Sequence, residues 1–241
     1  MLGRLNTLGG LDDLSKGIIR TVGPAEDRFT EDRLRILRAI RFAARFGSEL
    51  DEDIIKFLEK DSSLAGISSE RIRDEFLKGI KSAKSVRRFI KLLFKFNMLG
   101  EIFLPDMFID TRVGETRDHL IVIAMLLRRM DSNRLKTLLE EKTFTRDEIK
   151  GIVFLNNLRE GNAKAAIIMK RQEKNSGLSK EQIIEFARLV GLNGVFIDLF
   201  LGFELTVTGE QVMELTGIKA GPALGALING MEESNFNALF S

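Results

Sequence analysis

The sequence predicts an all-α protein with one short β segment near its N-terminus, and three observations support that prediction. Only three of the 241 residues are proline, at positions 24, 105 and 222. From residue 34 onward, apolar residues recur every three or four positions, as they do on one face of a helix. The clearest β-branched run, residues 17–23, is short and is bounded by glycines.

Composition narrows the class of protein further. A hydrophobic fraction of 44% and a charged fraction of 30% are typical of a globular chain rather than a disordered or membrane-spanning one. Residues 1–5 lack the basic-then-apolar pattern of a signal peptide, so we expect a cytoplasmic protein without membrane partners. The absence of Cys excludes disulfides and thiolate zinc sites, and the single His, His119, cannot supply a histidine-based metal cluster.

Local signals place the individual elements. The run 17–23 predicts a strand that follows a turn at Gly9-Gly10. Thr30 resembles an N-cap with Glu31 and Asp32 in the first turn, which predicts a helix that Gly47 ends. Further helices are expected at 51–60, 69–80, 83–97, 116–130, 132–141, 145–158, 161–172, 179–190, 195–203, 209–215 and 222–232.

The charge is unevenly distributed along the chain. Residues 1–100 hold 20 basic and 15 acidic residues, a net +5, and the remainder holds 17 against 20, a net −3. One basic series has helical spacing of three, four, three and four, with no acid between Glu75 and Glu101: Lys81, Lys84, Arg88, Lys91 and Lys95. Such a stripe suits phosphate contacts with RNA, and its alternative is an ordinary solvated face.

The eighteen Phe residues carry all the aromatic character, because Tyr and Trp are absent. They recur on apolar helix faces, so we expect a core role rather than base stacking for Phe42, Phe46, Phe57, Phe76, Phe89 and Phe96.

Asp32 and Arg35 form the pair with the most specific chemistry. On a helix, residues three apart are neighbours, so this spacing places a carboxylate acceptor beside a planar guanidinium donor. Together they can satisfy the Watson-Crick edge of cytosine or adenine. By spacing alone, a surface salt bridge is the more ordinary interpretation.

The context of this pair resembles class II tRNA nucleotidyltransferases, the family of CCA-adding enzymes and bacterial-type poly(A) polymerases. Four linked motifs carry the resemblance: a GG..DL turn at 9–14, an IR.VG strand at 17–23, an ED..R..R helix from Glu31, and an ER...E helix at 70–75. The resemblance implies that Asp32 and Arg35 pair with the incoming base, that Glu31 orients Arg35, and that Arg38 assists. It further implies that Asp13 couples head to neck, and that Arg71 and Glu75 brace the neck, for which a purely stabilising role is equally compatible.

The resemblance also predicts a division of labour. It implies residues 1–28 as a remnant of a head domain, 29–100 as the neck, 101–203 as the body and 204–241 as the tail. Near the end, Lys219 beside the Gly221-Pro222 helix start is a further phosphate-binding candidate, and close glycine packing is the plain alternative.

The family's metal-binding carboxylates belong to a head that precedes the GG turn, and no such segment stands before Met1. We therefore expect no catalytic or metal-binding residue here, and no nucleotide transfer by this chain alone. Mg²⁺ with ATP or CTP would act in the complete enzyme, with a head supplied in the same chain or as a separate polypeptide and a tRNA-like 3′ end as partner. The alternative is a stand-alone helical RNA-binding or scaffold module.

Overall fold

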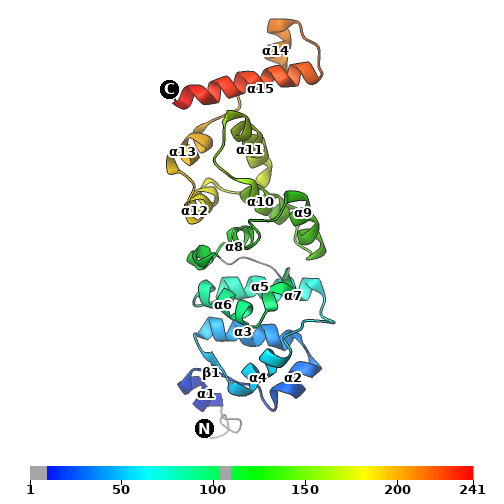
Figure 1. The fold of residues 1–241 in the computed structure, drawn as a ribbon, viewed down its shortest axis with the longest axis vertical. Coiled ribbons are helices and arrows are strands. Elements are labelled where there is room, and N and C mark those ends of the chain that lie inside the picture. The colour runs from blue at the N-terminus through cyan, green and yellow to red at the C-terminus, as the bar shows by residue number, and fades with distance from the viewer. Residues whose placement is uncertain (1–9, 104–109, 241) are drawn as a thin grey trace, which may run out of the picture. The chain divides into compact units, whose positions relative to one another are not determined.

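The computed structural model describes residues 10–103 and 110–240, and helices dominate them. Across these ranges the chain forms fifteen α-helices and one two-stranded sheet, which confirms the all-α prediction (Figure 1). The chain divides into two compact units, residues 1–149 and 150–241. Gly9 of the predicted turn and Pro105 lie outside the described residues. In the described part of the chain, no helix is long and apolar enough to cross a membrane.

A small sheet ties the first elements of unit 1 together. Helix α1 (Gly10–Lys16) precedes strand β1 (Ile18–Ile19), which pairs in parallel with β2 (Glu49–Leu50). The strand predicted within residues 17–23 is thus present but only two residues long, and its partner was not predicted. Gly10 starts a helix rather than completing a turn.

The helix predicted to start at the Thr30 N-cap is two helices, so that prediction was wrong. Helix α2 (Ala25–Glu31) ends at Asp32, which has an extended backbone, and α3 (Leu34–Phe46) begins after Arg33. The start of α2 is held by Asp53, whose Oδ2 accepts the Ala25 N–H at 2.8 Å from α4 (Glu52–Lys60). Asp32 then accepts the Leu34 N–H, which begins α3.

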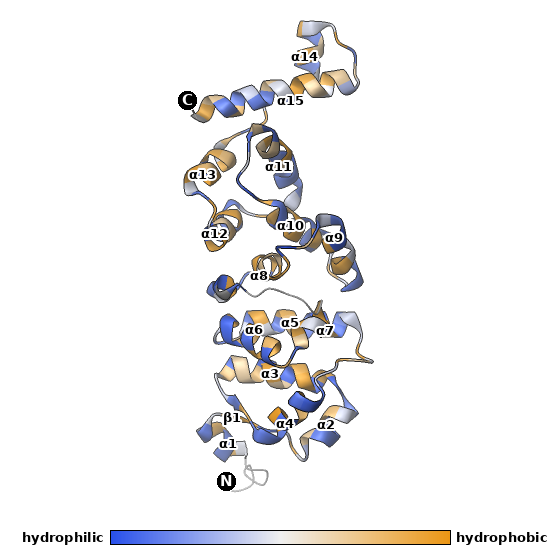
Figure 2. Cartoon of the chain, in the orientation of Figure 1, coloured by the Kyte–Doolittle hydropathy of each residue, from blue (hydrophilic) through white to orange (hydrophobic). Residues whose placement is uncertain are grey.

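The remainder of unit 1 packs around α3. Helices α5 (Ser69–Ser82) and α6 (Val86–Lys95) lie against it, and the 3₁₀ helix η1 (Thr111–Glu115) packs on α6. The described helices of unit 1 are completed by α7 (Met98–Ile102), α8 (His119–Leu126), α9 (Ser132–Glu141) and the start of α10 (Arg146–Asn157). Figure 2 shows α8 as a mostly apolar helix, and its residues 121–126 are all buried.

Phenylalanine builds much of this core. The rings of Phe76 and Phe103 meet edge to face at 5.2 Å, and those of Phe29 and Phe57 lie 5.0 Å apart. Phe89 is fully buried and its ring occupies the space where a Gly79 side chain would stand. The core role predicted for Phe57, Phe76, Phe89 and Phe96 is confirmed, because all four are buried.

The helix predicted at 83–97 is present as α6, but the basic stripe predicted from Lys81 to Lys95 does not lie on one helix. Lys81 is in α5, Lys84 is in the connection, and Arg88, Lys91 and Lys95 are in α6. The break occurs because Ser85 caps α6 by accepting the Arg88 N–H. The five cations therefore do not form one continuous helical stripe.

Unit 2 consists of the rest of α10 followed by α11 (Ala163–Ser176), α12 (Lys180–Val190), α13 (Gly194–Gly202), α14 (Gly209–Thr216) and α15 (Pro222–Asn237), with a final 3₁₀ turn η2 (Ala238–Phe240). Helix α15 packs on α11 and α14. Capping boxes at Ser179 and Thr208 start α12 and α14, close to the predicted positions. The buried Lys170 donates to the carbonyls of Phe200 and Leu201 at the end of α13.

Candidate nucleotide and nucleic-acid interface

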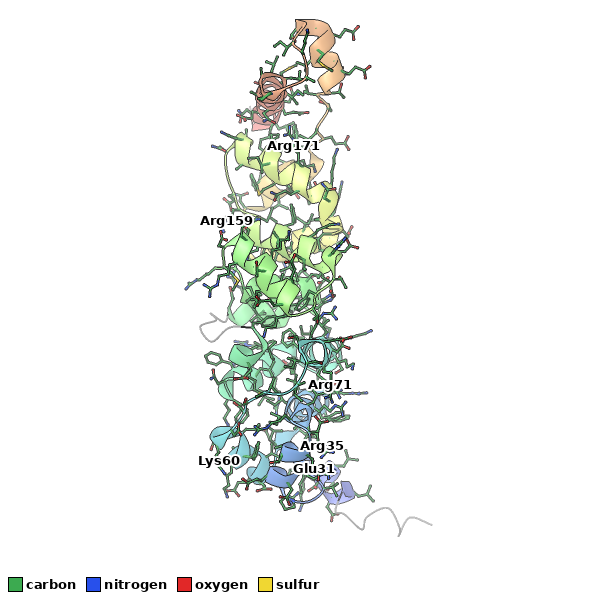
Figure 3. All side chains as sticks on the ribbon, turned by 90° about the vertical axis from the view of Figure 1, so that its right-hand side faces the viewer. Glu31, Arg35, Lys60, Arg71, Arg159 and Arg171 are labelled. Carbon is green, nitrogen blue, oxygen red and sulfur yellow. The ribbon has the colours of Figure 1, made fainter. Side chains whose placement is uncertain are left out.

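The junction of α2 and α3 gathers an acid and two arginines. Glu31, the last residue of α2, accepts hydrogen bonds from Arg28 Nη1 at 2.7 Å and from Arg35 Nη1 at 2.6 Å. Arg35 Nη1 also donates to the Arg28 carbonyl at 3.0 Å. Figure 3 shows Glu31 and Arg35 beside one another at this junction. The contact predicted between these two residues is therefore present in the free protein.

This arrangement fixes the charge of Glu31 and the direction of Arg35. The hydrogen bond from Arg35 holds the pKa of Glu31 below its ordinary value, against the opposing effect of desolvation and with further help from Arg28. Glu31 is thus a carboxylate at neutral pH. Within the described part of the chain, the Nε and Nη2 groups of Arg35 have no protein partner. Those donors can meet a ligand.

The two carboxylate oxygens of Asp32 have different partners. Oδ1 accepts the Leu34 N–H at 3.1 Å, and Oδ2 lies 3.5 Å from Arg71 Nη2 of α5. A separation of 3.5 Å is too long for a strong hydrogen bond, so Oδ2 can accept a better donor. The half-buried Asp32 and Arg35 are not neighbours within one helix, as the spacing had suggested, because the helix break separates them.

Glu75 links α5 to α3 through its carboxylate, whereas Arg71 contacts Asp32. Its buried carboxylate binds Arg41 Nε at 2.8 Å and lies 3.6 Å from Arg38 Nε and 3.4 Å from Lys78 Nζ. Arg38 remains half-exposed beside the junction. Arg71 thus contacts Asp32 between α2 and α3, and Glu75 contacts α3 itself, a geometry compatible with the bracing role and with a purely structural one. Arg41 was not singled out from the sequence, although its place in the ED..R..R helix suggests it.

Asp13 meets the strand motif through Arg20. Arg20 Nε lies 3.2 Å from Asp13 Oδ2, and its Nη2 lies 3.1 Å from Asp51 Oδ2 at the start of α4. The first two sequence motifs are therefore joined by one arginine. Arg20 belongs to the IR.VG motif, but its pairing with Asp13 and Asp51 was not predicted, because these residues come from separate elements.

The basic surface of α6 borders an open hollow of about 810 Å³. Four cations and one acid are among its lining residues, which are Glu49, Ser85, Arg87, Arg88, Lys91, Leu92 and Lys95. Arg88 is partly engaged already, donating to the Ser48 carbonyl at 2.6 Å and to Glu49 at 2.7 Å. Arg87 joins the surface although the predicted stripe omitted it. Lys81 and Lys84 are exposed outside α6.

Two other sequence predictions concern Lys219 and metal binding. Lys219 is exposed in the connection between α14 and α15 of unit 2. Among residues 10–103 and 110–240, no group of three or more carboxylate or imidazole side chains could hold a metal ion.

Comparison with known proteins shows what this chain is similar to. Residues 49–109 match the family model described as "Probable RNA and SrmB- binding site of polymerase A". The chain is 24% identical over 250 residues to the CCA-adding enzyme of Leuconostoc mesenteroides subsp. mesenteroides, covering 95% of this chain and 61% of that enzyme. This chain thus spans about three-fifths of that relative's length.

Two solved structures share the fold at 21% identity each. The Bacillus stearothermophilus CCA-adding enzyme in complex with CTP matches 97% of this chain and 64% of its own, with a TM-score of 0.67. The Thermotoga maritima CCA-adding enzyme complexed with tRNA matches 96% and 63%, with a TM-score of 0.60. The fold of this chain is therefore that of the portion of these two solved enzymes that it matches. Residues 49–109 match the polymerase A family model, and the chain as a whole is similar to CCA-adding enzymes.

Proposed function

We propose that this chain is the RNA-binding and nucleotide-selecting part of a template-independent tRNA nucleotidyltransferase or poly(A) polymerase. Residues 29–100 act as the neck, 101–203 as the body and 204–241 as the tail, with residues 1–28 as the end of a head domain. Metal-dependent transfer would come from a head that completes the enzyme. The alternative, a helical RNA-binding or scaffold module, lacks any use for the nucleotide site.

The α2–α3 junction is the observation that carries this proposal. Asp32 Oδ2 offers an acceptor, and Arg35 Nε and Nη2 offer donors, which is the pattern that the Watson-Crick edge of cytosine or adenine requires. Glu31 holds the guanidinium at 2.6 Å before any base arrives, so less rotamer entropy is lost on binding. The relatives support the assignment, since solved CCA-adding enzymes of the same fold hold CTP or ATP.

The basic surface supports the RNA part of the proposal. The cations Arg87, Arg88, Lys91 and Lys95 outnumber the single acid Glu49 around the hollow. Contacts of this kind are made to phosphates, give affinity without sequence selection, and weaken as salt rises. The tRNA complex of the T. maritima enzyme is consistent with a tRNA-like partner.

Substitution of Arg35 tests the proposal. Binding of CTP and ATP is measured by calorimetry on the chain reconstituted with a nucleotidyltransferase head polypeptide, and tRNA binding by anisotropy across a salt series. Arg35→Ala should weaken nucleotide binding by roughly tenfold to a hundredfold, the contribution of one bidentate base contact of about 1–3 kcal/mol. It should leave tRNA affinity nearly unchanged.

The matched control is Arg171→Ala, an exposed arginine of α11 in unit 2 (Figure 3), which should change neither measurement. Salt-dependent tRNA binding with no nucleotide effect of Arg35→Ala would favour the scaffold alternative. No binding of either ligand by the reconstituted wild type would contradict the proposal altogether.

A further inference from the structure

The outward face of α3 carries an aromatic and arginine ladder that the proposed function does not use. Residues 34–46 contain four arginines and no acid. The rings of Phe42 and Phe46 are stacked, with centroids 6.0 Å apart and planes 13° from parallel. Arg41 Cζ lies 4.3 Å from the Phe42 centroid, and Arg45 Cζ lies 5.4 Å from the Phe46 centroid.

These two rings do not have the core role that their apolar spacing predicted. Phe46 is 54% exposed and Phe42 is only half-buried, whereas Phe29, Phe76 and Phe89 are fully buried. The prediction for Phe46 was wrong because the core-facing side of α3 is already filled by buried residues that include Leu37, Ile40 and Ala44. A large apolar ring kept at the surface between arginines calls for a partner that offers a flat face and negative charge.

We infer that this ladder, consisting of Phe42, Phe46 and Arg45, stacks the unpaired bases of the RNA 3′ segment; the inference rests on the proposed function. Unpaired bases stack on aromatic rings and on guanidinium planes without requiring a particular sequence. The ladder supplies both kinds of surface within two turns of helix.

Helix geometry places the ladder in line with the nucleotide-selecting pair. Arg35, Arg38, Phe42 and Arg45 recur at spacings of three, four and three, so they follow one face of α3. Arg35 and Phe42 are seven residues apart, a rise of about 10 Å. Stacked bases are about 3.4 Å apart, so a strand ending near Arg35 reaches Phe42 after about three steps.

The surrounding charge favours RNA over a polypeptide. Arg38 and Arg45 are exposed, and a Cβ added to Gly47 would lie 3.4 Å from Lys84 Cδ, so Lys84 flanks the end of the helix. The acid beneath this face, Glu75, is buried and bound to Arg41. The exposed side chains therefore present positive charge beside the rings, which complements phosphates.

The composition of the chain permits a direct test. Because the protein contains neither Trp nor Tyr, Phe46→Trp introduces its only indole at the ladder. The probes are a tRNA-like minihelix with a single-stranded 3′ tail and the same duplex with a blunt end. We expect the tailed RNA to quench the indole fluorescence of the Phe46→Trp variant and the blunt RNA to bind without quenching. Leu215→Trp, at a 78% exposed position of α14, is the matched reporter and should not be quenched by either RNA.

A second variant keeps the inference testable whether or not the indole fits. Phe46→Leu retains an apolar side chain but has no ring face, so affinity for the tailed RNA should fall about tenfold and affinity for the blunt RNA should not change. Two results would overturn the stacking role. One is that Phe46→Leu binds the tailed RNA and the blunt RNA with the same affinities as wild type. The other is that the indole emission of the Phe46→Trp variant shifts only when a polypeptide partner is added. Failure of wild type to bind either RNA would instead remove the proposed function itself.

Discussion

Removal of the Glu75 charge should destabilise unit 1, chiefly because Arg41, one of the three cations around Glu75, loses its counterion. Arg41 is only 12% exposed and lies 2.8 Å from Glu75, so Glu75→Gln leaves a nearly buried guanidinium without its counterion. Breaking a buried pair costs about 3 kcal/mol at the lower end of its range. Arg38 and Lys78 are 45% and 59% exposed, and each contributes about 0–1 kcal/mol. The expected total is therefore about 3–5 kcal/mol.

Thermal unfolding followed by far-ultraviolet circular dichroism measures this effect on the chain as a whole. A loss of about 3 kcal/mol lowers the Tm of a unit of this size by about 6–12 °C. Arg38→Ala is the control, and because the Arg38 side chain is half-exposed, we expect a shift of under about 3 °C. The reasoning would be refuted if Glu75→Gln lowered Tm by under about 2 °C, or if Arg38→Ala lowered it as much as Glu75→Gln.

Two further predictions concern packing and pH. Glu148→Gln loses the charge that Arg73 binds at 2.7 and 2.9 Å, so urea titration should show about 1.5–3 kcal/mol lost at pH 7. The folded pKa of Glu148 lies below its ordinary value, so this difference should persist above about pH 4.5 and vanish as the pH falls through the folded pKa; a difference independent of pH would contradict it. Gly79→Ala places a Cβ 2.0 Å from the Phe89 ring and should lower the free energy of unfolding by about 1–3 kcal/mol, whereas Gly230→Ala, with open space around it, should raise it by up to about 1 kcal/mol. Equal effects of the two glycine substitutions would count against the packing argument.

The pKa of Glu148 shows how the fold overrides desolvation. Burial of the carboxyl raises its pKa, but the Thr145 backbone N–H, the Arg73 guanidinium and the Thr145 hydroxyl together lower it by more. His119 Nε2 lies 3.3 Å from the same carboxylate. Since these partners come from α5, α8 and the start of α10, the cluster fastens three elements of unit 1, and it was invisible to local sequence patterns.

The sequence predicted helices well where local and tertiary signals agree. Helices α4, α9 and α12 begin and end within two residues of the expected positions, because an N-cap side chain and an apolar period mark each of them. At Thr30 the two signals disagree. Thr30 has the chemistry of an N-cap, but Pro24 and the distant Asp53 start a helix earlier, and Phe29 is buried against Phe57.

The candidate site was predicted in composition but not in geometry. The sequence named Glu31, Asp32 and Arg35, and the structure brings them to one junction. The sequence could not show that Arg71 faces Asp32 or that Glu75 binds Arg41. Both contacts join α5 to the region of α3 over more than thirty residues. Their roles in nucleotide selection stay predictions.

The helix break is itself the feature that would let the junction serve as the proposed base site. In an unbroken helix, Asp32 would be a first-turn acid whose carboxylate could swing freely in solvent. Here its extended backbone and the 3.1 Å bond from the Leu34 N–H fix Oδ1, so Oδ2 is directed by the start of α3. Glu31, at the end of α2, fixes Arg35 from the other side of the break. Two helix ends thus orient one acceptor and one donor fork before a nucleotide binds, and the cost of ordering them falls on folding rather than on recognition.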